Sequence, residues 1–225
     1  MLIEIKELTK EYKRGATVFQ AVNKVNLKVS SKDFVSIIGP SGSGKSTLIN
    51  MIAGLIVPTS GSIRIDGQNI LSMKDKEVSF YRNSKIGYIP QENSLLPNLT
   101  VLDNVVLPFF FFKRKGNITE RAYKLLKQVG IPHLAHSYPD ELSGGERRRI
   151  SIARALINNP DFLFADEPAS DLDSQTTKDI MALFGQLSQR GIGILMVTHE
   201  ADCLQYCNTI YEMNAGILTR NKGKQ

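Results

Sequence analysis

The N-terminal part of the chain alternates apolar and polar residues in two stretches, Leu2–Leu8 and Val25–Val29. A period of two places the apolar side chains on one face of a strand, so both stretches predict half-buried strands of an antiparallel sheet. Phe34–Ile38 differs, because it is an almost continuous apolar run that ends at a glycine. Such a run is typical of a strand buried on both faces, and we expect a helix to follow over Lys45–Ala53, closed by Gly54.

The C-terminal part repeats this pattern of buried runs that precede polar residues. Phe162–Ala165 and Ile194–Val197 predict two further buried strands, on either side of a helix around Thr176–Arg190. Residues of about 92–160 contain no strong strand signal and three helical stretches, Val101–Phe112, Thr119–Val129 and Gly144–Asn158. These elements predict a parallel α/β core with a helical insertion, in one compact unit.

The composition narrows the class of protein. Of the 225 residues, 42% are hydrophobic and 22% are charged, which is ordinary for a globular protein and excludes bulk disorder. The longest apolar stretches, Val105–Phe112 and Gly191–Val197, are shorter than the roughly 20 residues that span a bilayer. Met1–Glu7 mixes acidic residues with hydrophobic ones and lacks the regions of a signal peptide. We therefore expect a cytoplasmic protein that does not cross a membrane by itself.

The two cysteines, Cys203 and Cys207, are too few for a disulfide framework. Their spacing places them on one face of a helix, with His199 four residues earlier, but a structural zinc site needs a fourth ligand. We expect reduced, inert thiols and no metal at these residues.

The formal net charge of +6 leaves two anionic partners open, a nucleic acid and an anionic membrane surface. The basic clusters are dispersed and lack the interleaved aromatic residues of a single-strand binding groove; they are Lys113–Lys115, Arg147–Arg149 and Arg220–Lys224. We favour solvated basic faces with attraction to lipid headgroups, and we expect no nucleic-acid partner.

Residues 39–46 read Gly-Pro-Ser-Gly-Ser-Gly-Lys-Ser, which fits the pattern G-x-x-x-x-G-K-S between a predicted buried strand and a predicted helix. The glycines let consecutive backbone N–H groups point at phosphate oxygens, and the helix N-terminus adds its positive dipole end. Lys45 supplies a charge for the β and γ phosphates, and Ser46 supplies a hydroxyl for Mg²⁺. The loop predicts a phosphate-binding site formed by Gly39, Pro40, Ser41, Gly42, Ser43, Gly44, Lys45, Ser46 and Thr47.

Asp166 and Glu167 follow directly after the apolar strand Phe162–Ala165. This is the carboxyl end of a strand, which is the edge where parallel α/β sheets bind ligands. We expect Asp166 to hold Mg²⁺ through its water shell, and Glu167 to orient or deprotonate an attacking water.

Residues 142–146, Leu-Ser-Gly-Gly-Glu, open the predicted helix Gly144–Asn158, and Ser143 with the glycine amides forms a second helix N-terminus suited to anions. This segment resembles the LSGGQ signature of ATP-binding-cassette (ABC) ATPases, with Glu146 in place of the usual glutamine. The order of motifs along the chain also resembles this family from end to end: the loop at 39–46, Gln91 after the strand Ile86–Ile89, the signature, Asp166 and Glu167, the Ser170–Asp173 segment, and His199 after the strand Ile194–Val197.

The resemblance implies an α/β fold with a P-loop NTPase (RecA-like) core, an antiparallel β subdomain and a helical insertion. Residues 1–225 would form a single ABC ATP-binding domain. Within it, residues 1–91 and 161–225 would be the nucleotide-binding core with its β subdomain, and residues 92–160 the helical signature subdomain.

The resemblance also implies ATP and Mg²⁺ as cofactors and gives roles to single residues. Tyr12 matches the aromatic residue that stacks on adenine, Gln91 the glutamine that approaches Mg²⁺ and the attacking water, and Asp173 the aspartate of the D-loop. His199 matches the histidine that contacts the γ-phosphate. The implied catalytic residues are Lys45, Gln91, Glu167 and His199, and the implied metal ligands are Ser46, Gln91 and Asp166.

A second copy of the chain is the first implied partner. Two such domains would face each other head to tail, with each ATP between the loop of one copy and Ser143, Gly144, Gly145 and Glu146 of the other. Three residues depart from the family pattern: Pro90 before Gln91, Ala169 after the Glu-Pro pair, and Glu146. A carboxylate at 146 would weaken closure on phosphate unless an arginine such as Arg147 or Arg148 compensates.

The Phe109–Phe112 run after Gln91 is either core of the helical insertion, which we favour, or part of an exposed groove that receives a partner. In ABC transporters such a groove receives a short helix of the membrane subunit. The segment Leu99–Val105 and Pro108 look most like the branch of lipoprotein release, macrolide export and antimicrobial-peptide export. We therefore expect the ATP-hydrolysing subunit of a transporter, peripheral on the inner face of the cell membrane and bound to a separate permease.

The alternative is an ABC ATPase that acts on nucleic acid or the ribosome. A DNA-repair member would need a long coiled coil or a zinc module, and neither a heptad run nor a Cys-x-x-Cys pair is present. A ribosomal factor would need two tandem cassettes, whereas only one phosphate-binding loop occurs. The transporter subunit is favoured.

Overall fold

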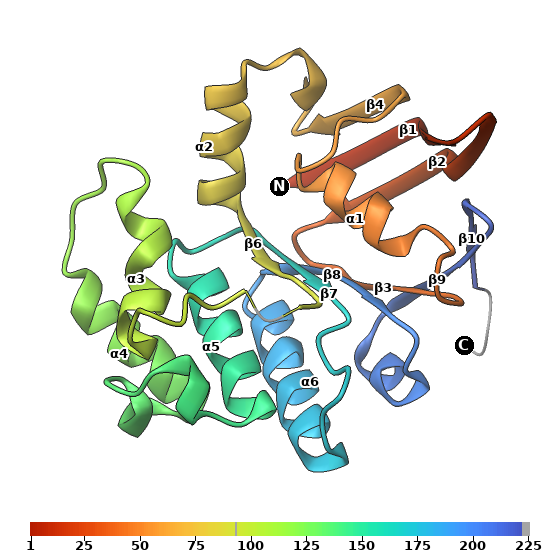
Figure 1. Cartoon of the computed structure of the whole chain (residues 1–225). Coiled ribbons are helices and arrows are strands. Elements are labelled where there is room, and N and C mark those ends of the chain that lie inside the picture. The colour runs from red at the N-terminus through yellow and green to blue at the C-terminus, as the bar shows by residue number, and fades with distance from the viewer. Residues whose placement is uncertain (93, 222–225) are drawn as a thin grey trace.

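The computed structural model describes residues 1–92 and 94–221 of the chain. A six-stranded sheet lies in the middle of the molecule, with an antiparallel sheet and two helices on one side and a group of helices on the other (Figure 1). The expected α/β class, with an antiparallel β part and a helical part, is confirmed by this arrangement.

The antiparallel sheet has the strand order β2-β1-β4-β5, with β1 at Leu2–Arg14, β2 at Thr17–Ser30, β4 at Ser60–Ile65 and β5 at Gln68–Asn69. Both predicted N-terminal strands are confirmed, but each is only part of a longer strand. The extensions, 9–14 and 17–24, are mostly polar and lie largely on the exposed hairpin that turns at Gly15, so their sequence shows no alternation.

The six-stranded sheet has the order β10-β9-β3-β8-β7-β6 and is parallel except for β10. Its strands are β3 (Phe34–Ile38), β6 (Ile86–Ile89), β7 (Phe162–Asp166), β8 (Gly193–Thr198), β9 (Thr209–Asn214) and β10 (Ile217–Arg220). The predicted buried strands are confirmed, and β7 and β8 are buried at every position because both faces of the sheet are covered.

Helix α1 (Lys45–Ile52) packs between the two sheets, where Leu48 and Ile52 meet inward residues of both. Alternate residues of β7 divide between two cores: Phe162 and Phe164 face α1, and Leu163 faces the helices on the other side. Those helices are α3 (Val101–Phe110), α4 (Ile118–Gln128), α5 (Gly144–Leu156) and α6 (Ser174–Gln189). The predicted helices are therefore confirmed, with ends that differ by a few residues.

Helix α2 (Asp75–Lys85) has no counterpart in the sequence-based prediction. It has one buried residue, Tyr81, and therefore lacks the apolar stripe that marks an amphipathic helix. The described residues also form short 3-10 helices at Ile70–Ser72, Pro132–Leu134, Pro139–Glu141 and Ala201–Tyr206. No helix in the described part of the chain has the length and apolar character needed to cross a membrane.

The Phe109–Phe112 run departs from the favoured expectation that it is core. Phe110 and Phe111 are 64% and 62% exposed, at the end of α3. Helix α3 buries Val101, Asn104 and Val105 instead, which lie one turn apart on its inner face. An apolar run longer than the buried face of its helix leaves its last residues at the surface.

Strand β6 packs tightly against α5 at Gly87, whereas Gly185 of α6 faces open space, so we expect opposite effects when each of these glycines is replaced by alanine. A Cβ on Gly87 would lie 2.5 Å from the carbonyl oxygen of Ala155, whereas nothing lies within 4 Å of a Cβ on Gly185 in α6. Gly87→Ala should lower the free energy of unfolding by about 1–3 kcal/mol. Gly185→Ala should raise it by about 0.5–1 kcal/mol, because alanine restricts the unfolded chain and favours a helix.

Urea unfolding at constant m-value measures both changes. Equal shifts of the two midpoints in the same direction would contradict the packing assigned to β6 and α5.

Candidate functional site

Residues 39–44 connect β3 to α1, at the carboxyl edge of the six-stranded sheet, and Lys45 and Ser46 form the start of α1. Gly39 has φ 152° and Gly44 has φ 105°. A Cβ on Gly39 would lie 2.1 Å from the carbonyl oxygen of Met213, and one on Gly44 would lie 1.9 Å from that of Ala21. Only glycine fits these two positions, because the loop is wedged against the backbone of two neighbouring strands.

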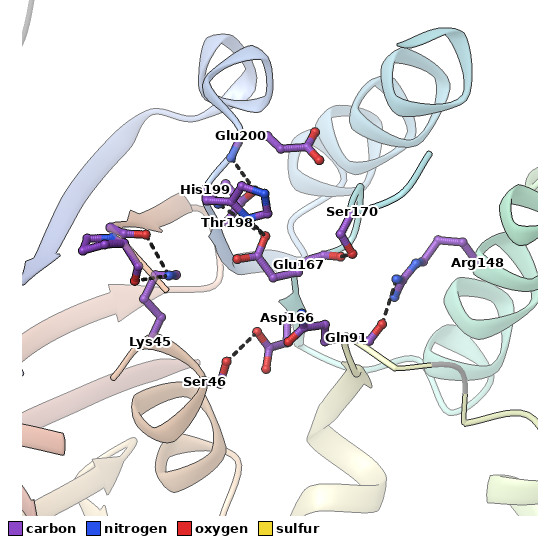
Figure 2. A network of polar contacts seen from close by, with 12 residues as sticks. Lys45, Ser46, Gln91, Arg148, Asp166, Glu167, Ser170, Thr198, His199 and Glu200 are labelled. Atoms are coloured by element: carbon purple, nitrogen blue, oxygen red, sulfur yellow. Dashed lines mark hydrogen bonds and ion pairs between the residues drawn. The ribbon is translucent and has the colours of Figure 1, made fainter. Parts of the chain in front are cut away.

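Lys45 begins α1, and its side chain folds back over the loop, as Figure 2 shows. Its Nζ donates hydrogen bonds to the carbonyl oxygens of Gly39 at 2.8 Å and Pro40 at 3.0 Å. The ammonium group is therefore held at the centre of the loop, beside the first N–H groups of the helix. A cation and a helix N-terminus together form a site for phosphate.

Asp166 is the last residue of β7 and Ser46 is the second residue of α1. The hydroxyl of Ser46 donates a hydrogen bond of 3.0 Å to Oδ1 of Asp166, and the side chain of Asp166 is buried (Figure 2). Burial raises the pKa of Asp166, and the charge of Glu167 adds to this, while the bond from Ser46 and the charges of Lys45 and Arg148 oppose it. The pair presents a hydroxyl and a carboxyl oxygen, which are the ligands that a hard cation prefers.

Glu167 follows Asp166 with φ 49°, a conformation that residues other than glycine rarely adopt. This turn is held by neighbours on two sides: the N–H of Glu167 donates to the carbonyl oxygen of Val197 at 2.9 Å, and the hydroxyl of Ser170 donates to the carbonyl oxygen of Glu167 at 3.0 Å. The reversal points the carboxylate away from the axis of β7 and toward the end of β8.

His199 comes directly after β8 and binds this carboxylate. Its backbone N–H and its Nδ1 lie 3.3 and 3.0 Å from Oε2 of Glu167. A carboxylate only accepts hydrogen bonds when it is ionised, so Nδ1 is the donor and Nε2 is the nitrogen that remains for a ligand. The imidazole is 61% exposed and the carboxylate 8% exposed, so the pair lies with the histidine on the solvent side.

A cavity of about 520 Å³ extends from Lys45, Glu167 and His199 to a more distant pair of aromatic rings. The rings of Tyr12 in β1 and Phe19 in β2 stack with centroids 5.8 Å apart. The residues that line the cavity are Tyr12, Phe19, Ala21, Ser41, Gly42, Gly44, Lys45, Ser46, Thr47, Gln91, Glu167 and His199. Phe19 was not predicted as a site residue, because a lone aromatic in a polar hairpin gives no signal until its strand is paired with Tyr12.

Gln91 lies just beyond β6, and its position is set by α5. The guanidinium of Arg148 donates to the carbonyl oxygen of Pro90 at 2.7 Å. It also donates to the carbonyl oxygen of Gln91 at 3.0 Å (Figure 2). Arg154 of the same helix donates to the carbonyl oxygen of Ser94 at 2.8 Å. These two arginines tie the segment after β6 to α5, a role that the sequence did not indicate.

The interpretation of Arg147–Arg149 as a solvated basic face is therefore wrong. Arg147 donates to the carbonyl oxygen of Leu142 at 2.7 Å, and Arg149 donates to Asp179 at 2.8 Å. Each of the three arginines satisfies internal acceptors. Of the basic segment Arg220–Lys224, residues 222–224 lie outside the described residues.

The segment 143–146 forms the N-terminus of α5 as a capping box. The hydroxyl of Ser143 donates to Oε2 of Glu146 at 2.7 Å. The backbone N–H of Glu146 donates to the Ser143 hydroxyl at 3.3 Å, and the backbone N–H of Ser143 donates to Oε2 of Glu146 at 2.8 Å. The bonds from Ser143 lower the pKa of Glu146. Arg147 and Arg148, which were considered as groups that could compensate the charge of Glu146, donate to backbone carbonyl groups instead, and Ser143 binds the carboxylate.

The structure does not bring every predicted residue to the cavity. In the described part of the chain, the residues lining it include none of Ser143–Glu146 and not Asp173. Asp173 caps α6 by accepting bonds from the N–H groups of Gln175 and Thr176 at 3.0 and 2.9 Å. The hydroxyl of Thr176 is the main cause of a lowered pKa of Asp173.

The cysteines are free, as expected, and they lie at a 3-10 helix rather than an α-helix. Burial raises the pKa of Cys203 to about 11 and that of Cys207 to about 12, which makes both thiols unreactive at neutral pH. Among the described residues, no group of three or more histidine, cysteine, aspartate and glutamate side chains is arranged to hold a metal ion.

A glycine loop that cradles a lysine, a hydroxyl paired with a buried carboxylate, and a glutamate held by a histidine together define a nucleotide-binding protein of the P-loop class. Comparison with known proteins gives the family. Residues 22–170 match the family model described as ABC transporter. The chain belongs to this family as an ATP-binding domain and is an ATPase.

Relatives agree with this membership. The chain is 41% identical over 216 residues to an uncharacterised ABC transporter ATP-binding protein of Methanocaldococcus jannaschii, an alignment that takes in 96% of each chain. It is 38% identical over 224 residues to the macrolide export ATP-binding/permease protein of Chlorobaculum tepidum, with 100% of this chain and 34% of that protein aligned. The chain thus spans about a third of the length of the latter relative.

Solved structures agree as well. A dimeric ATP-binding cassette in a post-hydrolysis state, bound to ADP and Pi, superposes with a TM-score of 0.91 at 37% identity over 99% of this chain and 100% of that one. The ADP conformation of another cassette of an ABC transporter superposes with a TM-score of 0.82 at 28% identity, over 98% and 91% of the two chains.

The burial of Asp166 predicts a change in pH-dependent stability. Because its pKa is raised in the folded state, the folded chain holds this proton more tightly than the unfolded chain. The wild-type chain should therefore lose stability as the pH rises through the interval between the two pKa values. Asp166→Asn removes the charge and keeps an oxygen for Ser46, so it should be more stable by about 1 kcal/mol above that interval.

Thermal unfolding without nucleotide or Mg²⁺, followed across acidic to neutral pH, tests this expectation. The advantage of the variant should vanish at the acidic end. A variant that is less stable than wild type at neutral pH would show that the ionised carboxylate contributes to the fold.

Proposed function

We propose that this chain is the ATP-hydrolysing subunit of an ABC transporter and powers a membrane permease for export or extraction of its substrate. The observation that carries the proposal is the single cavity in which Lys45, Glu167 and His199 meet the stacked ring of Tyr12. ATP hydrolysis needs a cation that binds the phosphates, a carboxylate that activates water and an aromatic face on which the adenine base stacks.

Glu167 acts as the general base in this proposal. Its carboxylate is fixed by two bonds from His199 and by the left-handed turn after β7, so it is positioned before substrate enters. Lys45 binds the β and γ phosphates from the loop, and the exposed imidazole of His199 contacts the γ-phosphate on the side opposite Nδ1. Gln91 reaches the same cavity from β6 and orients the attacking water.

Mg²⁺ fits the residues beside the loop. Ser46 and Asp166 already share a hydrogen bond and present two hard oxygen atoms, and Gln91 adds an amide oxygen from the cavity wall. The metal ion, when bound, neutralises charge on the phosphates. Few protein ligands suffice, because Mg²⁺ takes most of its ligands from phosphate and water.

Tyr12 is the stacking surface for adenine. Phe19 supports it from the neighbouring strand, and Lys10 lies 5.3 Å above the same ring. The part of the Tyr12 ring that lines the cavity is the surface offered to a flat base.

A second copy of the chain completes the site head to tail. Ser143 and Gly144 are exposed at the N-terminus of α5, outside the cavity of their own chain, where a helix dipole can meet the phosphate of another copy. The cassette with the TM-score of 0.91 is itself described as a dimer. The Ser143 hydroxyl donates its one hydrogen bond to Glu146, so this hydroxyl must turn away from Glu146 before it can donate to a phosphate.

The permease docks beside the segment that follows Gln91. A groove of about 430 Å³ lies between α2 and the end of α3, lined among others by Tyr88, Pro108, Phe111 and Arg154. Its mixed apolar and cationic lining suits a short amphipathic helix of a membrane subunit, which would hold the chain on the inner face of the cell membrane. An action on nucleic acid is not favoured, since Arg147–Arg149 is occupied by internal acceptors.

Replacing Glu167 tests the assignment of the base. Glu167→Gln should lower ATP turnover by about 10²–10⁴-fold and leave ATP binding intact, because the carboxylate acts on water and the loop holds the phosphates. The variant should form an ATP-dependent dimer in size-exclusion chromatography, whereas Lys45→Ala should stay monomeric.

Glu200→Gln is the matched control, because it makes the same change next to His199 on a residue that does not line the cavity. Its turnover should stay near the wild-type value. Wild-type turnover in Glu167→Gln would refute the assignment.

A further inference from the structure

The connection between α3 and α4 exposes aromatic and basic side chains together. In the segment Phe110–Lys115, the aromatic-basic loop, Phe110, Phe111, Lys113 and Lys115 are exposed. Figure 1 shows this connection at the outer edge of the molecule, away from the six-stranded sheet. Two exposed phenylalanines next to two exposed lysines are unusual on a surface that meets only water.

The loop is held in place by its inward residues, which alternate with the outward ones. The ring of Phe112 packs edge-on against Phe80 of α2 at 5.2 Å, and the guanidinium of Arg114 lies 5.7 Å above Phe112. Arg114 also donates a 2.8 Å bond to Ser84 and a short bond to Asn83. The side chains of Phe112 and Arg114 therefore form an inner row that is fixed against α2. The exposed side chains of Phe111, Lys113 and Lys115 form the outer row.

The charge within the segment of the outer row has one sign. No aspartate or glutamate occurs between Asp103 and Glu120, and Glu120 is paired with Lys124 at 2.6 Å. On the neighbouring helix α2, Glu77 lines a hollow together with Phe112, and the two lysines Lys76 and Lys85 line the same hollow. The acidic residue near the inner row is therefore accompanied by two cations.

We propose that the aromatic-basic loop binds the surface of an anionic lipid bilayer directly, independently of the permease. Lys113 and Lys115 would approach the headgroup charges, and the ring of Phe111 would enter the boundary between headgroups and acyl chains. The exposed ring of Phe111 stands beside two exposed lysines in a segment without acidic residues, which matches a surface that is negative outside and apolar beneath. The contact would orient the chain before or during its association with a membrane subunit.

Vesicle cosedimentation of the isolated wild-type chain tests the proposal, with vesicles of phosphatidylcholine alone and with about a third phosphatidylglycerol. We expect binding to the anionic vesicles only, weakened by added salt. Lys113→Gln combined with Lys115→Gln should reduce the partition coefficient by on the order of tenfold, and Phe111→Ser should reduce it by several-fold at every salt concentration.

Lys32→Gln combined with Lys178→Gln is the matched control, because it removes the same charge at exposed positions of other elements. It should bind nearly as well as wild type. Equal loss in this control would show that net charge alone attracts the chain. Equal binding to both kinds of vesicle, or unchanged binding of the two loop variants, would also overturn the proposal and leave the loop as a protein contact. ATP turnover of the double lysine variant and of the control, which should stay at the wild-type value, separates this test from that of the proposed ATPase function.

Discussion

The parallel pairing of β3, β8 and β7 positions the groups on which the site depends. Ile38 lies opposite Thr198, and Asp166 lies opposite Val197, so the three strands end at the same level. The phosphate-binding loop, His199 and Glu167 each follow one of these ends. A shift of any strand by one register step would move its group by about 3.3 Å and exchange the two faces of the strand. The two packed cores that enclose the sheet therefore also determine the geometry of the site.

The burial that fixes the strands also means that the site lowers the stability of the folded chain. Asp166 has a raised pKa because it is enclosed, and Glu167 holds a backbone conformation that favours glycine. Both are maintained by neighbours: Ser46 binds the first carboxylate, and His199 with the backbone of Val197 holds the second residue. This is the pattern of a site whose groups are arranged for a ligand, at some expense of the stability of the free chain.

The core of this fold and the centre of the site were predictable from sequence, because both depend on local patterns. The apolar runs of β3, β7 and β8 and the loop 39–46 are contiguous, and they predicted Glu167 as a candidate at the end of β7, whereas His199 was predicted through the resemblance of the motif order to ABC ATPases. Helix α2 and the long β1–β2 hairpin were not predictable, since their residues are polar and owe their structure to pairing and packing. Arg148 and Phe19 were missed for a related reason, as each acts through a residue that is distant in sequence. The exposure of Phe110 and Phe111 likewise depends on which face of α3 is buried.

The central claim is that one chain carries two incomplete halves of an ATP site, a cavity around Lys45 and a separate helix end at Ser143. Mixing two inactive variants tests it most directly. A dimer of Lys45→Ala with Ser143→Arg would contain one doubly damaged site and one intact site. ATP-induced dimerisation, measured by analytical ultracentrifugation, should therefore appear in the mixture and not in either variant alone. A mixture that dimerises no better than its components would contradict the head-to-tail arrangement.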